Sequence, residues 1–193
     1  MSTITQKPDT NFISYADTKD IVVEGLTFQP TNPEFYDDIL KISKVEQIVV
    51  RNCIINPKGG NREDGVDINR LCKDVSITDC TIGSGDKYAV TIKGGCVGVE
   101  LNDVEIVGRG GWERVDIDLG NYSDSNMIRT RGIELIDVRR QDGQPVRVRC
   151  GLADRPLIYG GHVKVLFWQS LMIKAYVWGK YALVRLGLIG WER

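Results

Sequence analysis

Histidine and proline are scarce in this sequence, and the cysteines do not cluster, which narrows the kinds of site the chain can hold. Among 193 residues there are one histidine, His162, six prolines and five cysteines, with no Cys-x-x-Cys pair. A zinc site needs clustered ligands that such a composition does not supply. We therefore expect no metal site and no cofactor, and we interpret the cysteines as small buried residues in a reducing compartment.

An excess of charge of one sign and long apolar runs are missing as well. The 25 basic and 26 acidic side chains give a net charge of -1, which argues against a general nucleic-acid-binding protein. The first nine residues lack the basic and apolar stretches of a secretory signal, so we expect synthesis inside the cell. The longest apolar region, 163–191, contains four basic residues and is a poor membrane span.

What the sequence does contain is glycine, with 21 residues, and a repeat in which apolar residues recur at i, i+2, i+5 and i+7. Five segments fit, at spacings of 27, 27, 24 and 29 residues, and they begin at Ile21, Ile48, Val75, Val99 and Ile128. The alternation within each segment is that of a strand. A glycine, asparagine or aspartate precedes the third apolar position each time, and these residues tolerate the left-handed backbone of a corner.

A further short strand follows each segment after a loop. The middle residues of these third strands are Lys41, Asp67, Thr91, Asp116 and Arg147. Three short strands in a repeat of about 25 residues are typical of one coil of a parallel β-helix, and parallel crossovers are right-handed in nearly all cases. We predict an all-β fold, a right-handed single-stranded parallel β-helix of about five to six coils.

The repeat divides the chain into three parts. Residues 1–20 are expected to form an N-terminal cap or arm, and residues 21–151 five coils. In residues 152–193 we expect an insertion up to Gly161, then a final coil or a C-terminal helix. Seven of the 15 aromatic residues follow Arg155, and this tail carries +5 whereas residues 1–154 carry -6.

The aromatic tail has more large apolar side chains than one core face can bury. We therefore predict an interface with partner subunits, a trimer of this chain above all, with a cap on the chain's own helix as the alternative. The residues assigned to this interface are Phe167, Trp168, Tyr176, Trp178 and Trp191.

The outward side chains of the third strands should line up as columns on one flat sheet. They would gather acids around a lysine and an aromatic ring, a surface that suits sugar hydroxyls. Asp67 and Asp116 are expected two rungs apart, about 9.6 Å, at the wide limit for the carboxylates of inverting glycosidases. The residues assigned to carbohydrate contacts are Tyr88, Lys93, Trp112, Glu113 and Asp118.

The stretch from Asn61 to Gly111 resembles the core of the polygalacturonases, which belong to the pectate-lyase-like right-handed β-helix superfamily. The family's Asn-Thr-Asp-Gly motif falls on residues 61–65 with one extra residue, so its acid aligns with Asp64. Its Gly-Asp-Asp motif falls on residues 85–87, where Asp86 is kept and Lys87 replaces the second acid. The resemblance implies the fold, with catalytic motifs that are degraded: Arg109 stands where the family has histidine.

Two function classes follow. A short β-helix with short loops and an apolar tail also resembles bacteriophage tailspikes and other virion appendages, which are commonly trimeric. The first hypothesis is therefore a structural or receptor-binding β-helix that acts in an oligomer or virion and contacts polysaccharide. The alternative is a polysaccharide-cleaving hydrolase or lyase, whose catalytic residues would be Asp64, Asp67, Asp86 and Asp116.

Overall fold

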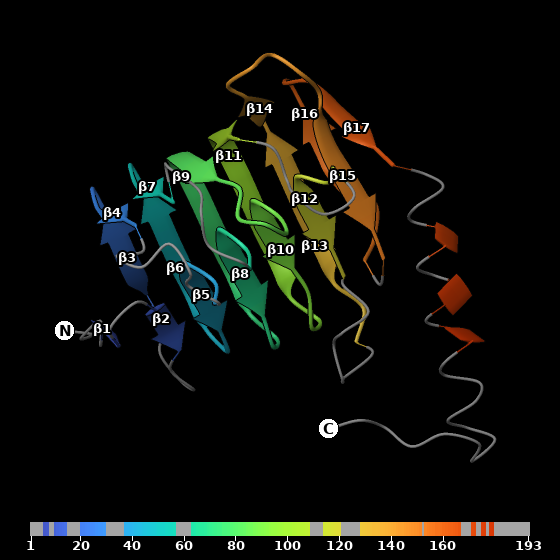
Figure 1. The fold of residues 1–193 in the computed structure, drawn as a ribbon. Helices are drawn as coiled ribbons and strands as arrows, with labels where there is room; N and C mark the ends of the chain where they lie inside the picture. The colour runs from blue at the N-terminus through green and yellow to red at the C-terminus, as the bar shows by residue number, and fades with distance from the viewer. Residues whose placement is uncertain are drawn as a thin grey trace.

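Two parallel sheets enclose one apolar core in the computed structural model of the chain (Figure 1). The structure describes residues 6–7, 10–14, 20–29, 37–56, 63–108, 114–120, 128–151, 153–166, 171–172, 175–176 and 178–179.

The third-strand sheet holds the strands that close each coil. Its order is β1 (Gln6–Lys7), β2 (Thr10–Ser14), β5 (Leu40–Ser43), β8 (Val66–Asn69), β10 (Val90–Ile92), β12 (Ile117–Leu119), β15 (Val146–Cys150) and β17 (Val163–Val165). Every pair is parallel except β1 with β2.

The first-strand sheet holds the strands that open each coil. Its order is β16 (Leu157–Tyr159), β13 (Arg131–Ile136), β11 (Val97–Val107), β9 (Lys73–Gly83), β6 (Glu46–Arg51) and β3 (Ile21–Glu24). Past the corner, the short strands β4 (Thr27–Phe28), β7 (Ile54–Ile55) and β14 (Arg139–Arg140) add to it. The predicted all-β parallel β-helix is confirmed. It makes about four turns, fewer than the predicted five to six.

The repeat predicted from the sequence is the register of the first four coils. Ile21 pairs with Ile48, Ile48 with Val75, and Val75 with Val99. The corners are where glycine, asparagine and aspartate were found, and Asn52 and Asp79 have φ angles of 53° and 52°. The hydrophobic pattern and the left-handed residues therefore determine this part of the fold.

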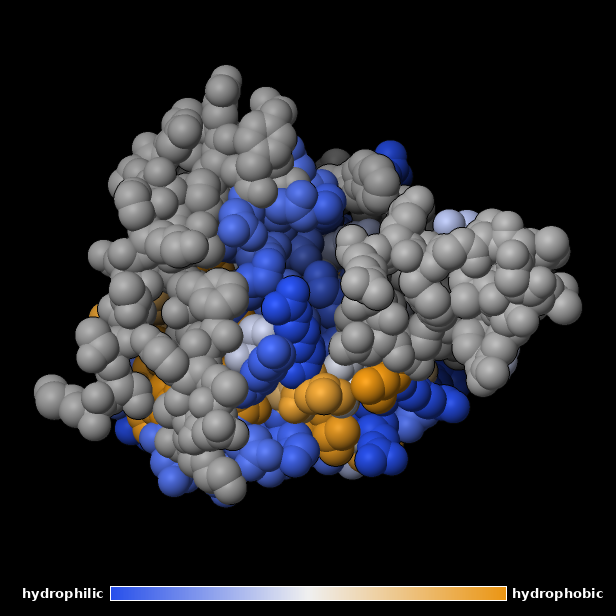
Figure 2. Space-filling view, turned by 90° about the horizontal axis from the view of Figure 1, so that it is seen from below, coloured by the Kyte–Doolittle hydropathy of each residue, from blue (hydrophilic) through white to orange (hydrophobic). Residues whose placement is uncertain are grey.

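The fifth repeat was assigned wrongly. Ile133, not Ile128, pairs with Val99, and Ile106 pairs with Arg140, so an arginine occupies the fourth inward position of this coil. The sequence pattern requires an apolar residue at that position, so Arg140 hides the true register and the match falls five residues earlier, at Ile128. Ile128 is instead exposed beside Leu71, since a Cβ added at Gly95 would touch both side chains. Viewed from below, a few hydrophobic residues group together among hydrophilic ones in the coloured part of Figure 2.

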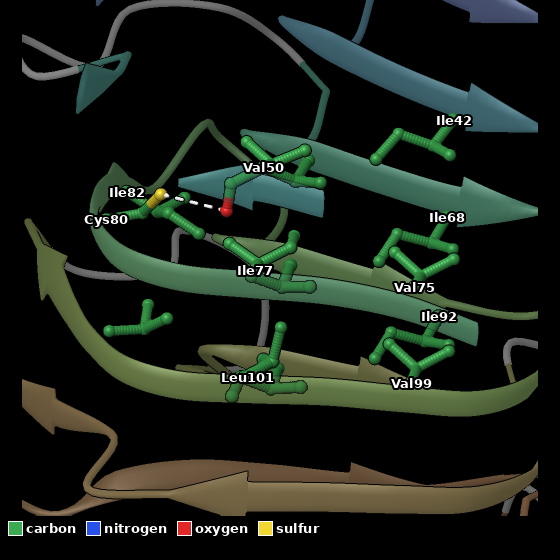
Figure 3. Packing of buried hydrophobic residues seen from close by; sticks show 14 of the residues in the cluster. Ile42, Val50, Ile68, Val75, Ile77, Cys80, Ile82, Ile92, Val99 and Leu101 are labelled. Carbon is green, nitrogen blue, oxygen red and sulfur yellow. Dashed lines mark hydrogen bonds between the residues drawn. The ribbon is translucent and has the colours of Figure 1, made fainter. Parts of the chain in front are cut away.

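Inside the coils, equivalent side chains stack into ladders one strand spacing apart. Figure 3 shows Val50, Ile77 and Leu101 on successive rungs, with the Cys80 thiol donating a hydrogen bond to the carbonyl of Val50 at 3.7 Å. The backbone N–H of Cys53 donates to Cys80 Sγ at 3.4 Å. All five cysteines are buried and none of them forms a disulfide, as predicted, and burial raises the pKa of the Cys80 thiol to about 11.

The two ends of the helix differ from the sequence interpretation. Within the expected N-terminal arm, β2 continues the third-strand sheet by pairing with β5. Within the expected insertion, β16 pairs with β13 and so opens another coil, which β17 closes. The described residues after it are helical, at 171–172, 175–176 and 178–179, beyond β17 in Figure 1.

Because the rungs stack closely, adding a side chain at one buried glycine, Gly83, should lower the stability of the fold. A Cβ added at Gly83 would overlap the backbone carbonyl of Asn56 on the preceding rung. Gly83→Ala should therefore lower the free energy of unfolding by about 1–3 kcal/mol, measured by urea denaturation. Gly179→Ala is the control, because a Cβ there meets nothing within 4 Å. Equal unfolding curves for the two variants would contradict this packing.

Candidate functional site

The outward face of the third-strand sheet carries one column of polar side chains. Lys41 pairs with Asp67, Asp67 with Thr91, Thr91 with Asp118, and Asp118 with Arg149. Asp118 therefore takes the place that was predicted for Asp116. A slip of two residues keeps every side chain on its own face, so alternation alone cannot distinguish the two registers. Asp67 and Asp118 are then two rungs apart, about 9.6 Å.

These side chains are buried, whereas the sequence interpretation placed them on an open surface. Asp64, Asp67, Asp116, Asp118 and Tyr88 all have at most 4% of their surface exposed. Lys93 is partly buried, and Asp86 lies apart on an exposed turn. Trp112 and Glu113, the other predicted sugar contacts, lie outside the described residues.

The first group of buried charges, which we name the carboxyl cluster, consists of Asp38, Lys41, Asp64, Asp67 and Lys93. Lys41 Nζ lies 3.0 Å from Asp38 Oδ2 and 3.7 Å from Asp67 Oδ2. Lys93 Nζ lies 3.2 Å from Asp67 Oδ1. The backbone N–H of Asp64 donates to Asp38 Oδ1 at 3.1 Å, so Asp64 adjoins two acids that are paired with the two lysines.

Asp64 is the member of the carboxyl cluster with the most altered acidity. Burial, and then the negative charge of Asp38, raise the pKa of Asp64 to about 8. Burial and the charge of Asp67 also raise the pKa of Asp38. For Lys93, burial has the largest single effect and opposes the charged form, but the charges of Asp67, Asp64 and Asp38 together outweigh it and the pKa is raised. At neutral pH the cluster thus holds a carboxyl proton on Asp64 beside charged lysines.

The second group joins Asp118, Arg149 and Tyr88. Arg149 donates from Nε to Asp118 Oδ1 at 2.9 Å and from Nη2 to Asp118 Oδ2 at 3.0 Å. It also donates to the hydroxyl of Tyr88, whose ring centroid is 5.1 Å from the guanidinium carbon. Two parallel bonds to one carboxylate are the strongest form of this pairing. Tyr88 and Asp118 therefore hold an arginine of the same chain in the positions predicted for sugar contacts.

The third group surrounds Asp116. Arg140 donates from Nη1 to Asp116, from Nη2 to Asp142 at 2.8 Å and to the carbonyl of Gly108 at 2.9 Å. The backbone N–H of Arg147 donates to the other oxygen of Asp116 at 2.8 Å. Asp116 therefore ties its own coil to the next coil and lies apart from the carboxyl cluster.

Sequence reasoning missed Asp38, Arg140 and Arg149, which complete these groups. Arg140 was hidden because a charged residue at an inward position breaks the apolar pattern. Arg149 lies at an outward position of β15, where a charged side chain usually stays in solvent, and Asp38 lies before β5, outside the alternating pattern. An acid on one rung with a base on the neighbouring rung is the signal that would have found the pairs.

Of the four predicted catalytic acids, the structure brings Asp64 and Asp67 together and leaves Asp86 and Asp116 elsewhere. In the part of the chain that the structure describes, no three histidine, cysteine or acidic side chains are placed to hold a metal ion. A hollow of about 500 Å³ at the first corner is lined by other residues, among them Thr78, Asn102 and Asp137.

The predicted interface residues are described only in part. Tyr176 and Trp178 are exposed, while Phe167, Trp168 and Trp191 lie outside the described residues. Among the described helical residues there is no segment long and apolar enough to cross a bilayer.

Comparison of the chain with protein-family models, with curated proteins and with solved structures finds no match.

Proposed function

We propose that this chain is a structural β-helix without catalytic activity that works inside an oligomer of its own copies, as a tailspike or another virion appendage does. One observation carries the proposal. The helical residues after the last coil present Leu171, Met172, Tyr176 and Trp178 with 45–69% of their surface exposed. Large apolar side chains gathered on a protein surface mark sites of association.

The pairing of the buried charges supports the absence of catalysis. Asp118 is held by Arg149 and Asp116 by Arg140, in each case by a residue of a later coil. A glycosidase instead needs one carboxylate that is available to water or substrate and one acid that can deliver its proton. The same pairs join successive coils, which is a stabilising role.

Substitution in the helical segment tests the proposal. Leu171→Glu with Met172→Glu should lower the average solution mass, because it puts charge into the apolar surface that associates. Val22→Glu is the matched control, because Val22 is 59% exposed on β3 at the other end of the helix. Sedimentation velocity over a hundredfold concentration range gives the mass. The same mass for both variants and the original chain would contradict the proposal.

The alternative, cleavage of a polysaccharide, is favoured by the carboxyl cluster. With its pKa raised to about 8, Asp64 keeps a proton at neutral pH, the state a general acid needs, and Asp67 lies in the same cluster. The test is to incubate the chain with acidic polysaccharides and to detect new reducing ends or unsaturated products. Cleavage that is lost in Asp64→Asn and in Asp67→Asn, but kept in Asp86→Asn, would establish the enzyme.

A further inference from the structure

Two of the buried cysteines lie side by side on neighbouring coils, at the turn that leads into the first strand of a coil. Cys72 and Cys96 directly precede Lys73 and Val97, which pair in the first-strand sheet. The backbone N–H of Val97 donates to the carbonyl of Cys72 at 2.9 Å. Neighbouring strands lie about 4.8 Å apart, and a disulfide joins Cα atoms about 4.4–6.8 Å apart. The backbones at Cys72 and Cys96 therefore have the spacing that a disulfide needs.

The side chains of these two cysteines have the same orientation. The Cys72 thiol donates to the carbonyl of Asn69 at 3.0 Å, and the Cys96 thiol donates to the carbonyl of Lys93 at 3.0 Å. In each case the carbonyl belongs to the residue three positions earlier, so the two turns have equivalent geometry. The two thiols also hydrogen-bond to each other, so no other side chain separates the sulfur atoms.

Cys53 and Cys80 form a second stacked pair, at the first corner, where the backbone N–H of Cys53 donates to Cys80 Sγ at 3.4 Å. The two pairs differ in how well they stabilise a thiolate. The hydrogen bond from Cys96 lowers the pKa of Cys72; burial opposes this effect, and a backbone hydrogen bond at Val45 lowers the pKa further. Burial instead raises the pKa of Cys80 to about 11. Because the thiolate is the form that reacts with an oxidant, Cys72 is the more reactive thiol.

The turn before Cys72 provides access to this buried sulfur. The Cys72 side chain is fully buried, but its neighbours Leu71 and Lys73 are exposed. Arg70 and Leu71 have φ angles of 57° and 66°, a left-handed conformation that costs free energy in residues with a side chain. Local opening of the turn relieves this strain and lets a small oxidant reach Cys72.

We propose that Cys72 and Cys96 are a redox pair, which a peroxide converts into a disulfide that clamps two neighbouring coils. The Cys72 thiolate attacks one peroxide oxygen, the O–O bond breaks and hydroxide leaves, so Cys72 becomes a sulfenic acid. Cys96 Sγ then attacks this sulfur: the S–S bond forms, the S–O bond breaks, and the hydroxyl takes the Cys96 proton and leaves as water. The two sulfurs lose two electrons and the peroxide gains them. The inference is independent of the proposed function.

Peptide mapping after oxidation tests the pair. The folded, reduced chain is treated with hydrogen peroxide, the remaining thiols are blocked in urea, and tryptic peptides are identified by mass spectrometry without reduction. Trypsin cuts between all four cysteines of the two pairs, so each linkage gives its own product. We expect the Cys72–Cys96 linkage at about tenfold or more above the Cys53–Cys80 linkage, which is the matched control. Equal yields, or a Cys72 that stays reduced or is oxidised without Cys96, would overturn the inference.

The clamp and the order of the two steps have their own readouts. The linked chain should melt about 5–10 °C higher than the reduced chain, because a closed loop restricts the unfolded state. Dithiothreitol should reverse this rise, and a linked chain that melts no higher would overturn the clamp. In Cys96→Ser, dimedone should trap the sulfenic acid on Cys72, whereas in Cys72→Ser it should leave Cys96 unlabelled. Equal labelling of the two variants would overturn the assignment of Cys72 as the thiol that reacts first.

Discussion

Arg149→Met should lower the free energy of unfolding by about 3–5 kcal/mol, the typical effect of removing one partner of a buried ion pair. Arg149 is 3% exposed, and its guanidinium donates two hydrogen bonds to the fully buried carboxylate of Asp118. The methionine fills a similar volume but leaves that carboxylate without its cation in an apolar surrounding. Urea denaturation followed by circular dichroism measures the change.

An exposed ion pair in the same fold provides the control. Arg51 and Glu24 also join neighbouring rungs, at 2.9 Å, but each is about half exposed. Water already solvates both groups, so Arg51→Met should change stability by about 1 kcal/mol or less. If Arg149→Met lowers the free energy of unfolding no more than Arg51→Met does, the buried ion pairs do not hold the coils together as described.

Asp64→Asn should flatten the pH dependence of stability. In the folded chain the pKa of Asp64 is about 8, well above the value near 4 of an exposed aspartate. Between those two pH values the folded state binds more protons than the unfolded state, so stability falls as pH rises from about 4 to about 8. The asparagine side chain carries no charge at any pH, so the loss of stability on the order of a few kcal/mol should disappear in the variant.

Thermal unfolding at pH 5 and at pH 9 measures this effect. The difference in melting temperature between the two pH values should be smaller for Asp64→Asn than for the original chain. The residual slope then belongs to Asp38, whose pKa is also raised by burial. Asp86→Asn is the matched control, since Asp86 is exposed and should leave the curve unchanged. Parallel pH curves for Asp64→Asn and the original chain would contradict the buried proton.

The repeat made the fold predictable, because a strand ladder obliges each rung to place apolar residues where the previous rung has them. Val23, Val50, Ile77 and Leu101 could be stacked from the sequence alone, and they do stack. The prediction is wrong where an inward position of a rung holds a polar side chain. Arg140 stands above Ile106 because Asp116, Asp142 and the carbonyl of Gly108 hold its guanidinium.

The sequence predicts where the outward polar side chains of the third-strand sheet lie, but not which of them pair across neighbouring rungs. The third strands could be found by alternation, but alternation is indifferent to a slip of two residues, so Asp116 and Asp118 exchanged places. Burial was not visible either, because it depends on what packs over the sheet. The carboxyl cluster needed both pieces of information, since Asp38 joins it from outside a strand.

The measurement that tests the account most directly is the mass of the purified chain in solution, by size-exclusion chromatography with light scattering. The exposed apolar side chains of the helical segment, Leu171, Met172, Tyr176 and Trp178, predict an oligomer of this chain. A single species with the mass of one chain, at all concentrations and at low salt, would contradict the account.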